Sequence, residues 1–131
     1  MEPIAQAGDG VGLVVFAHGS SVADANEAVR RVASETARRC GFPLWEPAFL
    51  EQAEPNLVAA VGLLAARGAK KIVVAPYFLT MGIHLRRDLP LIVEEASRAH
   101  PGIEVACSAP LDGHPALVEI LAARVKQALA P

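Results

Sequence analysis

Apolar runs alternate with amphipathic stretches four times along this chain. Each run is short and rich in β-branched or aliphatic residues, which is typical of strands buried on both faces of a parallel sheet. The second run contains Pro47, whose nitrogen cannot donate to a neighbouring strand, so we expect that strand at an edge or a bulge. The predicted strands span residues 11–17, 43–50, 70–78 and 103–108.

Each apolar run is followed by a stretch whose apolar residues recur with the period of a helix. The first predicted helix covers residues 23–39 and ends before Gly41. The second begins at Pro55, which is tolerated in a first turn, and ends at Gly68.

The third and fourth predicted helices both carry a proline near their start. We expect the third to begin near Asp88–Pro90, after a loop through Met81 and Gly82. The fourth has Pro115 in its first turn. The apolar residues of the fourth helix that we expect to face the sheet are Leu117, Ile120, Leu121, Val125 and Leu129.

The alternation of strands and helices predicts the fold class. It indicates a single α/β domain with a doubly wound, mainly parallel four-stranded sheet and helices on both faces, as in flavodoxin-like folds. With 131 residues the chain is long enough to bury one core. We expect residues 1–10 to form a flexible lead-in and residues 11–131 to form the domain.

Composition excludes several classes of function. The chain is 53% hydrophobic and 20% charged, as in globular proteins, and its net charge of −2 provides no basic stripe for nucleic acid. No apolar segment approaches the ~20 residues that span a membrane. The N-terminus lacks the features of a secretory signal, and two cysteines without metal-type spacing favour a reducing compartment, so we expect the cytoplasm.

Polar residues with metal-binding or acid–base chemistry follow the predicted strands. His18 follows the first strand, Glu51 the second, His84 the third after a short loop, and His114 the fourth after another loop. Ligands bind at the carboxyl ends of the strands in such sheets, so these residues fall on the functional edge, whereas His100 falls on the opposite one. Two imidazoles and a carboxylate suit a divalent ion such as iron, cobalt, nickel or zinc.

Each of these residues also has a structural interpretation. His18 could satisfy a loop carbonyl, and Glu51 could be a solvated charge at a helix entry. His84 could be a surface residue, and His114, which precedes Pro115, could simply open the last helix. The chain has no dinucleotide fingerprint, phosphate loop or nucleophile elbow, and a Ser20–His18 hydrolase dyad has little support.

Four segments together resemble a known family. They are VVFAHGSS followed by ANEAV, then AFLEQAEPNL, then RGAKKIVVAPYFLTMGIHLRRDLP, and finally HPGIEV followed by PLDGHPALVEIL. In order and spacing they resemble the short CbiX-type chelatases, single-domain class II chelatases that insert a divalent metal into sirohydrochlorin. The resemblance extends from about Gly12 to Leu129.

The resemblance implies a site and an assembly. His18 and His84 would handle the metal, and Glu51 matches the acidic position between them, as ligand or as base. The substrates would be a sirohydrochlorin-like tetrapyrrole and Co²⁺, Fe²⁺ or Ni²⁺, with no tightly bound cofactor. Family members of this length typically pair as homodimers, so we expect a homodimer.

Further residues near these positions are candidates for holding the macrocycle. Arg86 and Arg87 could bind substrate carboxylates by charge-assisted hydrogen bonds, or remain solvated. Met81 and Ile83 could form an apolar surface beneath the ring, whereas we expect Leu79 to be ordinary packing. We add Ser20 and His114 as candidate substrate-binding residues.

Two positions depart from the family pattern. The family often has arginine directly after HGS, where this chain has Ser21, and a small residue before the loop histidine, where this chain has Ile83. These departures bear on the identity of the tetrapyrrole. Two other functions use the same residues: a tetrapyrrole or metal carrier without turnover, and a metal-dependent hydrolase.

Overall fold

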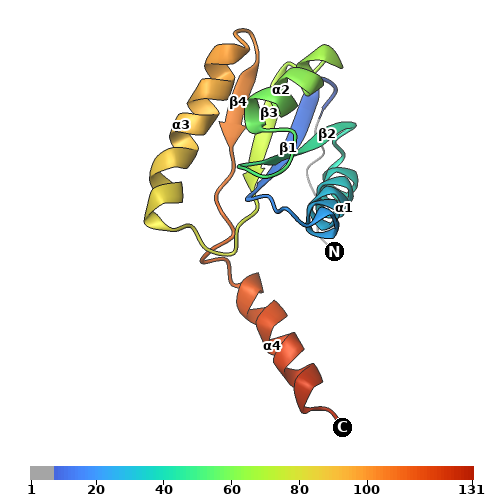
Figure 1. Cartoon of the computed structure of the whole chain (residues 1–131). Helices are drawn as coiled ribbons and strands as arrows, with labels where there is room; N and C mark the ends of the chain where they lie inside the picture. Colours follow the sequence, from blue (N-terminus) through green and yellow to red (C-terminus); the bar gives the residue numbers. More distant parts are fainter. Residues whose placement is uncertain (1–7) are drawn as a thin grey trace.

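The computed structural model describes residues 8–131 and contains one parallel sheet within them, in the strand order β2-β1-β3-β4. The doubly wound α/β architecture expected from the sequence is confirmed (Figure 1). The elements are β1 (Val11–Ala17), α1 (Ala23–Cys40), β2 (Leu44–Phe49), α2 (Leu57–Ala66), β3 (Lys71–Pro76), α3 (Ile83–Ala99), β4 (Glu104–Cys107) and α4 (Ala116–Leu129).

The expected lead-in, residues 1–10, lies mostly outside the described residues. Its described part, residues 8–10, forms a turn whose Gly10 carbonyl accepts hydrogen bonds from the Lys70 and Lys71 amides at 2.7 and 3.1 Å. No helix of the described chain is both long and apolar enough to cross a membrane.

β1 lies in the middle of the sheet and β2 at its edge. β1 pairs with β2 on one side and with β3 on the other, all in parallel. Pro47 of β2 is paired with Val15 of β1. Because β2 has only this one neighbouring strand, the N–H that proline lacks takes no hydrogen bond from the sheet. The edge position predicted from this proline is confirmed.

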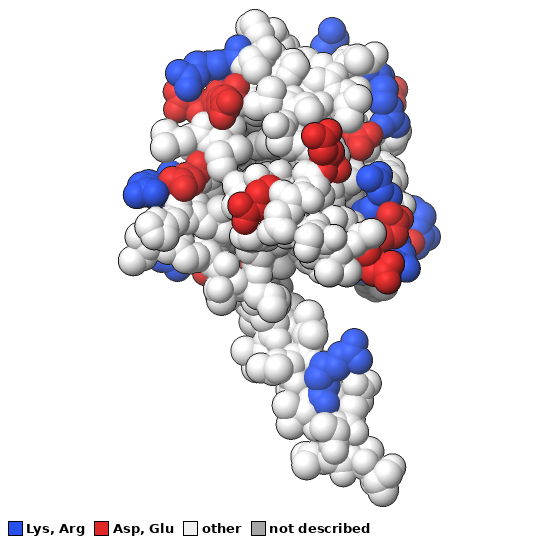
Figure 2. Space-filling view, viewed as in Figure 1, with Lys and Arg blue, Asp and Glu red and all other residues white. Residues whose placement is uncertain are grey.

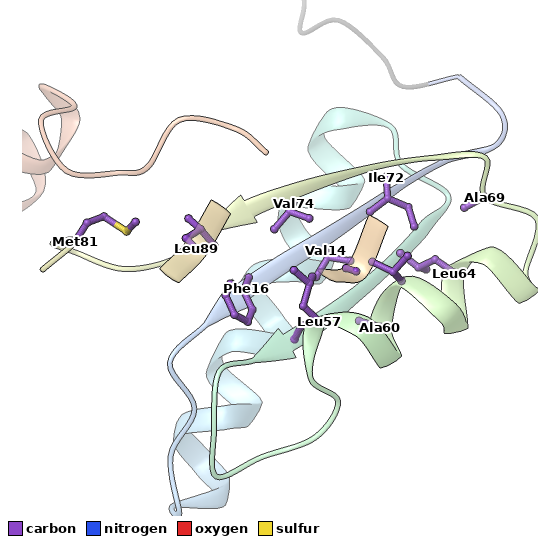
Figure 3. Packing of buried hydrophobic residues seen from close by; sticks show 13 residues of the cluster. Val14, Phe16, Leu57, Ala60, Leu64, Ala69, Ile72, Val74, Met81 and Leu89 are labelled. Carbon is purple, nitrogen blue, oxygen red and sulfur yellow. The ribbon is translucent and has the colours of Figure 1, made fainter. Parts of the chain in front are cut away.

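Successive residues of β1 point to opposite faces of the sheet and build two cores. Val14 and Phe16 join the larger cluster with Leu57 and Leu64 of α2 and Leu89 of α3 (Figure 3). The residues between them in β1 face the other way and pack on α1; the members of this second cluster are Leu13, Val15, Ala33 and Ala37. α2 and α3 therefore cover one face of the sheet, and α1 covers part of the other.

The third helix begins five residues earlier than we expected, at Ile83 instead of near Asp88. Gly82 is its N-cap, and the Arg86 amide donates to the Gly82 carbonyl at 3.0 Å. Pro90 therefore lies inside α3, where it leaves the Arg86 carbonyl without its usual partner. Pro90 is on the exposed side of the helix, where water can donate a hydrogen bond to that carbonyl. The sequence expectation was wrong because it placed this proline in a first turn.

The last helix does not pack on the sheet, so our expectation of an inward face was wrong. α4 projects away from the body of the molecule (Figure 1), and in this described part of the chain none of its residues is buried. The apolar residues expected to face inward are mostly exposed; they are Leu117, Ile120, Leu121, Val125 and Leu129. Periodicity shows that a helix has an apolar face, but it does not show which surface covers that face.

Candidate functional site

The loops after β1, β2 and β3 meet at the carboxyl edge of the sheet. His18 follows β1 directly, Glu51 lies just beyond β2, and His84 is in the first turn of α3. The Leu50 amide donates to the Ala17 carbonyl at 2.9 Å, and the Glu51 amide to the His18 carbonyl at 3.0 Å. The hydrogen bonding between β1 and β2 thus continues past the strands and places His18 beside Glu51.

Gly19 makes this close approach possible. Its φ is +92°, and a Cβ at this position would overlap the Glu51 carbonyl oxygen. No residue with a side chain fits there without moving the two loops apart. From the sequence Gly19 is recognisable only as part of a motif, because a close approach between two loops leaves no local signature.

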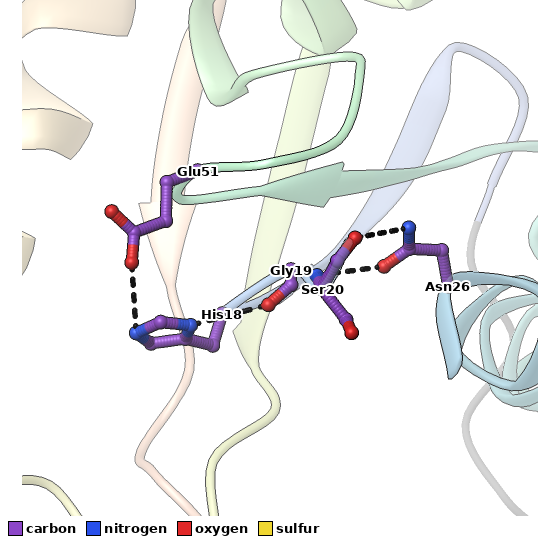
Figure 4. A network of polar contacts seen from close by, with 5 residues as sticks. All are labelled: His18, Gly19, Ser20, Asn26 and Glu51. Atoms are coloured by element: carbon purple, nitrogen blue, oxygen red, sulfur yellow. Dashed lines mark hydrogen bonds and ion pairs between the residues drawn. The ribbon is translucent and has the colours of Figure 1, made fainter. Parts of the chain in front are cut away.

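The side chains of His18 and Glu51 face each other (Figure 4). The distance from His18 Nε2 to Glu51 Oε1 is 3.4 Å, and both side chains are more than half exposed. His18 Nδ1 lies 3.2 Å from the Gly19 carbonyl, and because a carbonyl only accepts, Nδ1 donates. Nε2 is then the ring atom that is directed at Glu51 and available as an acceptor.

Such an exposed pair adds little to folding, at most about 1 kcal/mol. The position of the pair is fixed by the close approach of Gly19 to the Glu51 carbonyl and by the hydrogen bond of His18 Nδ1 to the Gly19 carbonyl. The arrangement presents one nitrogen and one carboxylate oxygen to the same small volume, which suits a proton or a divalent cation.

Asn26 holds the loop that follows His18. The Ser20 amide donates to Asn26 Oδ1 at 3.0 Å, and Asn26 Nδ2 donates back to the Ser20 carbonyl at 2.8 Å (Figure 4). Ser20 Oγ accepts from the Val22 amide at 3.0 Å, so this hydroxyl serves the start of α1. The sequence analysis missed this positioning role of Asn26, because its partner is the backbone of a residue six positions away.

A pocket of about 360 Å³ opens beside the pair and brings in His84. His18 and His84 both line it, and Nδ1 of His84 accepts from Nη2 of Arg87 at 3.4 Å. The rest of the wall is largely apolar and comes from the β2, β3 and α3 loops; it consists of Leu50, Phe78, Thr80, Gly82, Ile83, Leu85 and Asp88.

The three side chains that could bind a metal ion, those of His18, Glu51 and His84, are thus not all in contact. His18 and Glu51 are in contact, whereas His84 shares the pocket. Among residues 8–131, no group of three His, Cys, Asp or Glu side chains is close enough to hold a metal ion. The geometry brings His18 and Glu51 together and places His84 on the pocket that His18 also lines.

The apolar candidates for holding a ligand differ in their placement. Ile83 is 83% exposed and lines the pocket. Met81 is only 8% exposed and packs in the larger core, so its side chain offers no surface to a macrocycle. Leu79, which we expected to be ordinary packing, is 72% exposed. Loop residues do not alternate in a fixed way, so the sequence could not tell which of them point inward.

The charged candidates are engaged with neighbouring carboxylates. Arg86 pairs with Asp112 at 3.5 Å and Arg87 with Asp88 at 3.0 Å. Both arginine side chains are largely exposed, so a ligand carboxylate can reach either guanidinium.

The other two histidines have structural partners. Nδ1 of His114 accepts from the Ala116 amide at 3.0 Å, so this residue opens α4, as in its structural interpretation. His100, on the opposite edge, has Nε2 3.0 Å from the Val58 carbonyl. Neither is among the residues that line the pocket of His18 and His84.

A second hollow of about 320 Å³ lies on the other side of the His18 loop. Ser20, Ser21, Asn26 and Arg30 line it together with the loop after β2. Ser21 therefore faces this hollow, and the histidines line the other one.

Comparison with known proteins gives a consistent result. The family model described as CbiX matches residues 12–128. The chloroplastic sirohydrochlorin ferrochelatase of Arabidopsis thaliana is 33% identical over 122 residues, which are 93% of this chain and 54% of that protein. The sirohydrochlorin cobaltochelatase of Sulfolobus acidocaldarius is 34% identical over 119 residues, which are 91% of this chain and 93% of that protein.

Solved structures show the same fold. A putative cobalamin biosynthesis CbiX protein from Marinobacter aquaeolei matches with a TM-score of 0.78 and 30% identity, over 91% of this chain and 97% of that one. SirB from Bacillus subtilis with Fe³⁺ matches with a TM-score of 0.81 and 22% identity, over 92% of this chain. This chain spans about half the length of the Arabidopsis and Bacillus proteins, at 54% and 48%.

Proposed function

The chain belongs to the CbiX family, and on that premise we propose that it is a chelatase that inserts a divalent metal ion into sirohydrochlorin. The observation that carries the proposal is the exposed contact between His18 and Glu51, together with the pocket that His18 and His84 both line. A relative of nearly the same length is a sirohydrochlorin cobaltochelatase, and a longer one is a sirohydrochlorin ferrochelatase.

His18 and Glu51 receive the metal in this mechanism. Two ligands that are each about 2.1 Å from one tetrahedral ion lie about 3.4 Å apart. The separation of His18 Nε2 and Glu51 Oε1 is 3.4 Å, which matches the spacing of two ligands on one ion. His84 supplies a further imidazole from the pocket wall as the ion moves toward the macrocycle.

Incomplete coordination suits a metal that is a substrate. A closed site with four protein ligands retains its ion, whereas two protein ligands leave positions for water and then for the pyrrole nitrogens. We therefore assign no resident cofactor, and the divalent ion enters and leaves in each turnover. Imidazole and carboxylate accept Co²⁺, Fe²⁺ and Ni²⁺ alike, so these residues do not select among the three.

Glu51 is also the base of the reaction. A divalent ion replaces the two inner pyrrole protons of the macrocycle, and these protons need an acceptor near the metal. The Glu51 carboxylate is more than half exposed beside His18 Nε2, so it can take a proton and release it to water.

The macrocycle lies over the apolar part of the pocket in this proposal. Ile83 is the most exposed apolar side chain of the wall, and Phe78 and Leu50 continue the surface. Arg86 and Arg87 stand at the start of α3 and exchange their carboxylate partners for those of the substrate. Ser21 carries no positive charge with which to bind a substrate carboxylate. In the second hollow, Arg30 is the residue that provides such a charge.

We also propose a homodimer in the cytoplasm. The homodimer follows from the family resemblance, since this chain is about as long as one half of the longer matching proteins. Both cysteines, Cys40 and Cys107, are free thiols, a state that is typical of a reducing compartment.

An anaerobic assay tests the function. Purified protein is mixed with sirohydrochlorin and with Co²⁺, Fe²⁺ or Ni²⁺ in turn, and the absorption change of metallation is compared with the spontaneous rate. We expect acceleration with at least one metal. Stoichiometric binding of metal or macrocycle without acceleration would establish a carrier instead, and hydrolysis of generic esters or phosphate esters with zinc or manganese would favour the hydrolase.

A further inference from the structure

Arg87 contacts two side chains of the pocket that His18 and His84 line. Its Nε donates to Asp88 Oδ1 at 3.0 Å, and its Nη2 lies 3.4 Å from His84 Nδ1. His84 and Asp88 both line the pocket. Residues 84, 87 and 88 are three and four positions apart in α3, so they share one face of the helix. The guanidinium therefore lies beside the third side chain that could bind a metal ion.

The contact with a histidine distinguishes this arginine from its neighbours. Figure 2 shows several Lys and Arg side chains of the body beside Asp or Glu, so an ion pair by itself is ordinary on this surface. Arg86 is of that kind, since it pairs with Asp112 at 3.5 Å. Arg87 differs because its guanidinium also reaches an imidazole nitrogen.

This contact leaves His84 without a free lone pair. A guanidinium can only donate, so Nδ1 of His84 is the acceptor. A neutral imidazole has one lone pair and one N–H, so its proton is then on Nε2. A metal ion needs the lone pair of a ring nitrogen, and the positive charge of Arg87 also repels it. His84 is therefore blocked as a metal ligand, whereas His18 directs its Nε2 lone pair at Glu51.

The contact that blocks His84 is weak. A separation of 3.4 Å is at the long end for a hydrogen bond, and the Arg87 side chain is 65% exposed. A carboxylate binds a guanidinium more strongly than a neutral imidazole does, because both partners are then charged. A carboxylate that enters the pocket can therefore displace His84 from Arg87.

We propose that Arg87 is a positioning residue that makes His84 available to the metal only when the tetrapyrrole is bound. A carboxylate of the macrocycle takes the guanidinium, and this releases the Nδ1 lone pair of His84. The proposal rests on the proposed function, in which sirohydrochlorin is the ligand that carries carboxylates. The free protein holds the ion through His18 and Glu51, and His84 joins once the macrocycle is in place. This order keeps the ion from being retained by three protein ligands before its acceptor arrives.

The first test measures Co²⁺ binding to the full-length protein without tetrapyrrole, by titration calorimetry and by the visible absorption of the bound ion. His84→Ala is expected to leave the dissociation constant unchanged, because His84 is blocked in the wild type. Arg87→Met removes the block and is expected to lower the dissociation constant about tenfold. Adding His84→Ala to the Arg87→Met variant is expected to abolish this gain.

Arg86→Met is the matched control for the loss of charge. It removes the same positive charge from the next residue, whose side chain is exposed to a similar degree, 69% against 65%. Any gain in this variant measures the effect of charge alone. Equal gains in the Arg86 and Arg87 variants, or a gain that persists after His84→Ala, would overturn the block. Circular dichroism verifies that each variant is folded.

The second test determines which ring nitrogen carries the proton. Proton–nitrogen correlation spectra of the metal-free protein, in mildly alkaline buffer, distinguish the two tautomers of each histidine. The proton is expected on Nε2 of His84 and on Nδ1 of His18, and His84 is expected to lose its preference in the Arg87→Met variant. A wild-type His84 with its proton on Nδ1 would refute the proposal.

The third test adds sirohydrochlorin. The KM for Co²⁺ is expected to fall as the concentration of sirohydrochlorin rises in the wild type, and to be independent of it in Arg87→Met, because the two ligands are then no longer coupled through Arg87. A wild-type KM that does not respond would refute the release of His84 by the macrocycle. A complete lack of acceleration would contradict the proposed function instead, and the Co²⁺ affinities of the free protein would still decide whether Arg87 blocks His84.

Discussion

At the scale of single residues, the site depends on two atoms that the backbone brings together. His18 Nε2 and Glu51 Oε1 lie 3.4 Å apart because the β1 and β2 loops remain hydrogen-bonded past the strands. An exposed pair contributes little to stability, so substitutions here should affect chemistry far more than folding.

We predict that His18→Ala and Glu51→Gln each lower the rate of metallation by about 100-fold or more, since one removes a metal ligand and the other a proton acceptor. Initial rates at saturating metal, with melting curves to verify folding, measure this. Glu95→Gln, an exposed change of the same chemistry on α3, is the control and should retain full activity. Nearly normal rates in the His18 variant would rule out its role as a metal ligand.

Gly19 is the residue whose substitution should separate the pair. Gly19→Ala adds a Cβ that would overlap the Glu51 carbonyl oxygen, at a φ of +92°. We predict a loss of stability of at least about 1 kcal/mol from the backbone strain alone, and a loss of activity from the displaced loops. Chemical denaturation and the metallation rate measure the two effects.

Gly113→Ala is a control that introduces the same unfavourable backbone conformation without a steric overlap. Gly113 has a φ of +85°, and no atom lies within 4 Å of the place that a Cβ would take there. This control should lose stability but keep its metallation rate. Equal losses of activity in both variants would show that the close approach of Gly19 to Glu51 is not what positions the pair.

At the scale of elements, α3 is the helix that brings the third metal-type side chain to the site. Its start at Ile83 places His84 in the first turn, beside the pocket, and leaves Pro90 in the interior. The proline weakens the helix, because it removes one backbone hydrogen bond.

We predict that Pro90→Ala stabilises the protein by about 1 to 3 kcal/mol, because the alanine amide can donate to the Arg86 carbonyl. Pro90 is exposed, so no packing is lost. Chemical denaturation measures the change, and Pro101→Ala, in the turn after α3, is the control that should bring no gain. A destabilised Pro90→Ala variant would mean that the ring makes contacts that matter more than the missing bond.

At the scale of the whole molecule, the described chain is a body with one helix outside it. The body buries its two clusters on the two faces of the sheet, whereas α4 leaves apolar surface exposed. A structure of this kind gains stability from a partner in proportion to how tightly the partner binds.

We predict that the thermal midpoint of the wild type rises with protein concentration, because mass action favours the dimer in which α4 is covered. Scanning calorimetry over a wide concentration range measures this. Leu121→Glu places a charge on the exposed apolar surface of α4, and this variant should show a lower midpoint without concentration dependence. A wild-type midpoint that is constant over the range would contradict a dimer in which folding and association are coupled.

The sequence by itself determined the parallel sheet and the edge at which the candidate site residues lie. Buried apolar runs and helical periods are local properties, so they identified the strands and the edge position of Pro47. The rule that parallel strands place their carboxyl ends together then indicated His18, Glu51 and His84. Local patterns were sufficient for these conclusions because each depends on only a few consecutive residues.

Only the tertiary structure decided how close those residues lie and what covers each helix. The His18–Glu51 contact depends on the approach of Gly19 to a loop more than thirty residues away in the chain. The sequence did not show that α3 continues through Pro90 on its exposed side, or that α4 follows a connection in which Asp112 pairs with Arg86. These outcomes are set by contacts between distant segments, and a pattern along one segment carries no information about its partner.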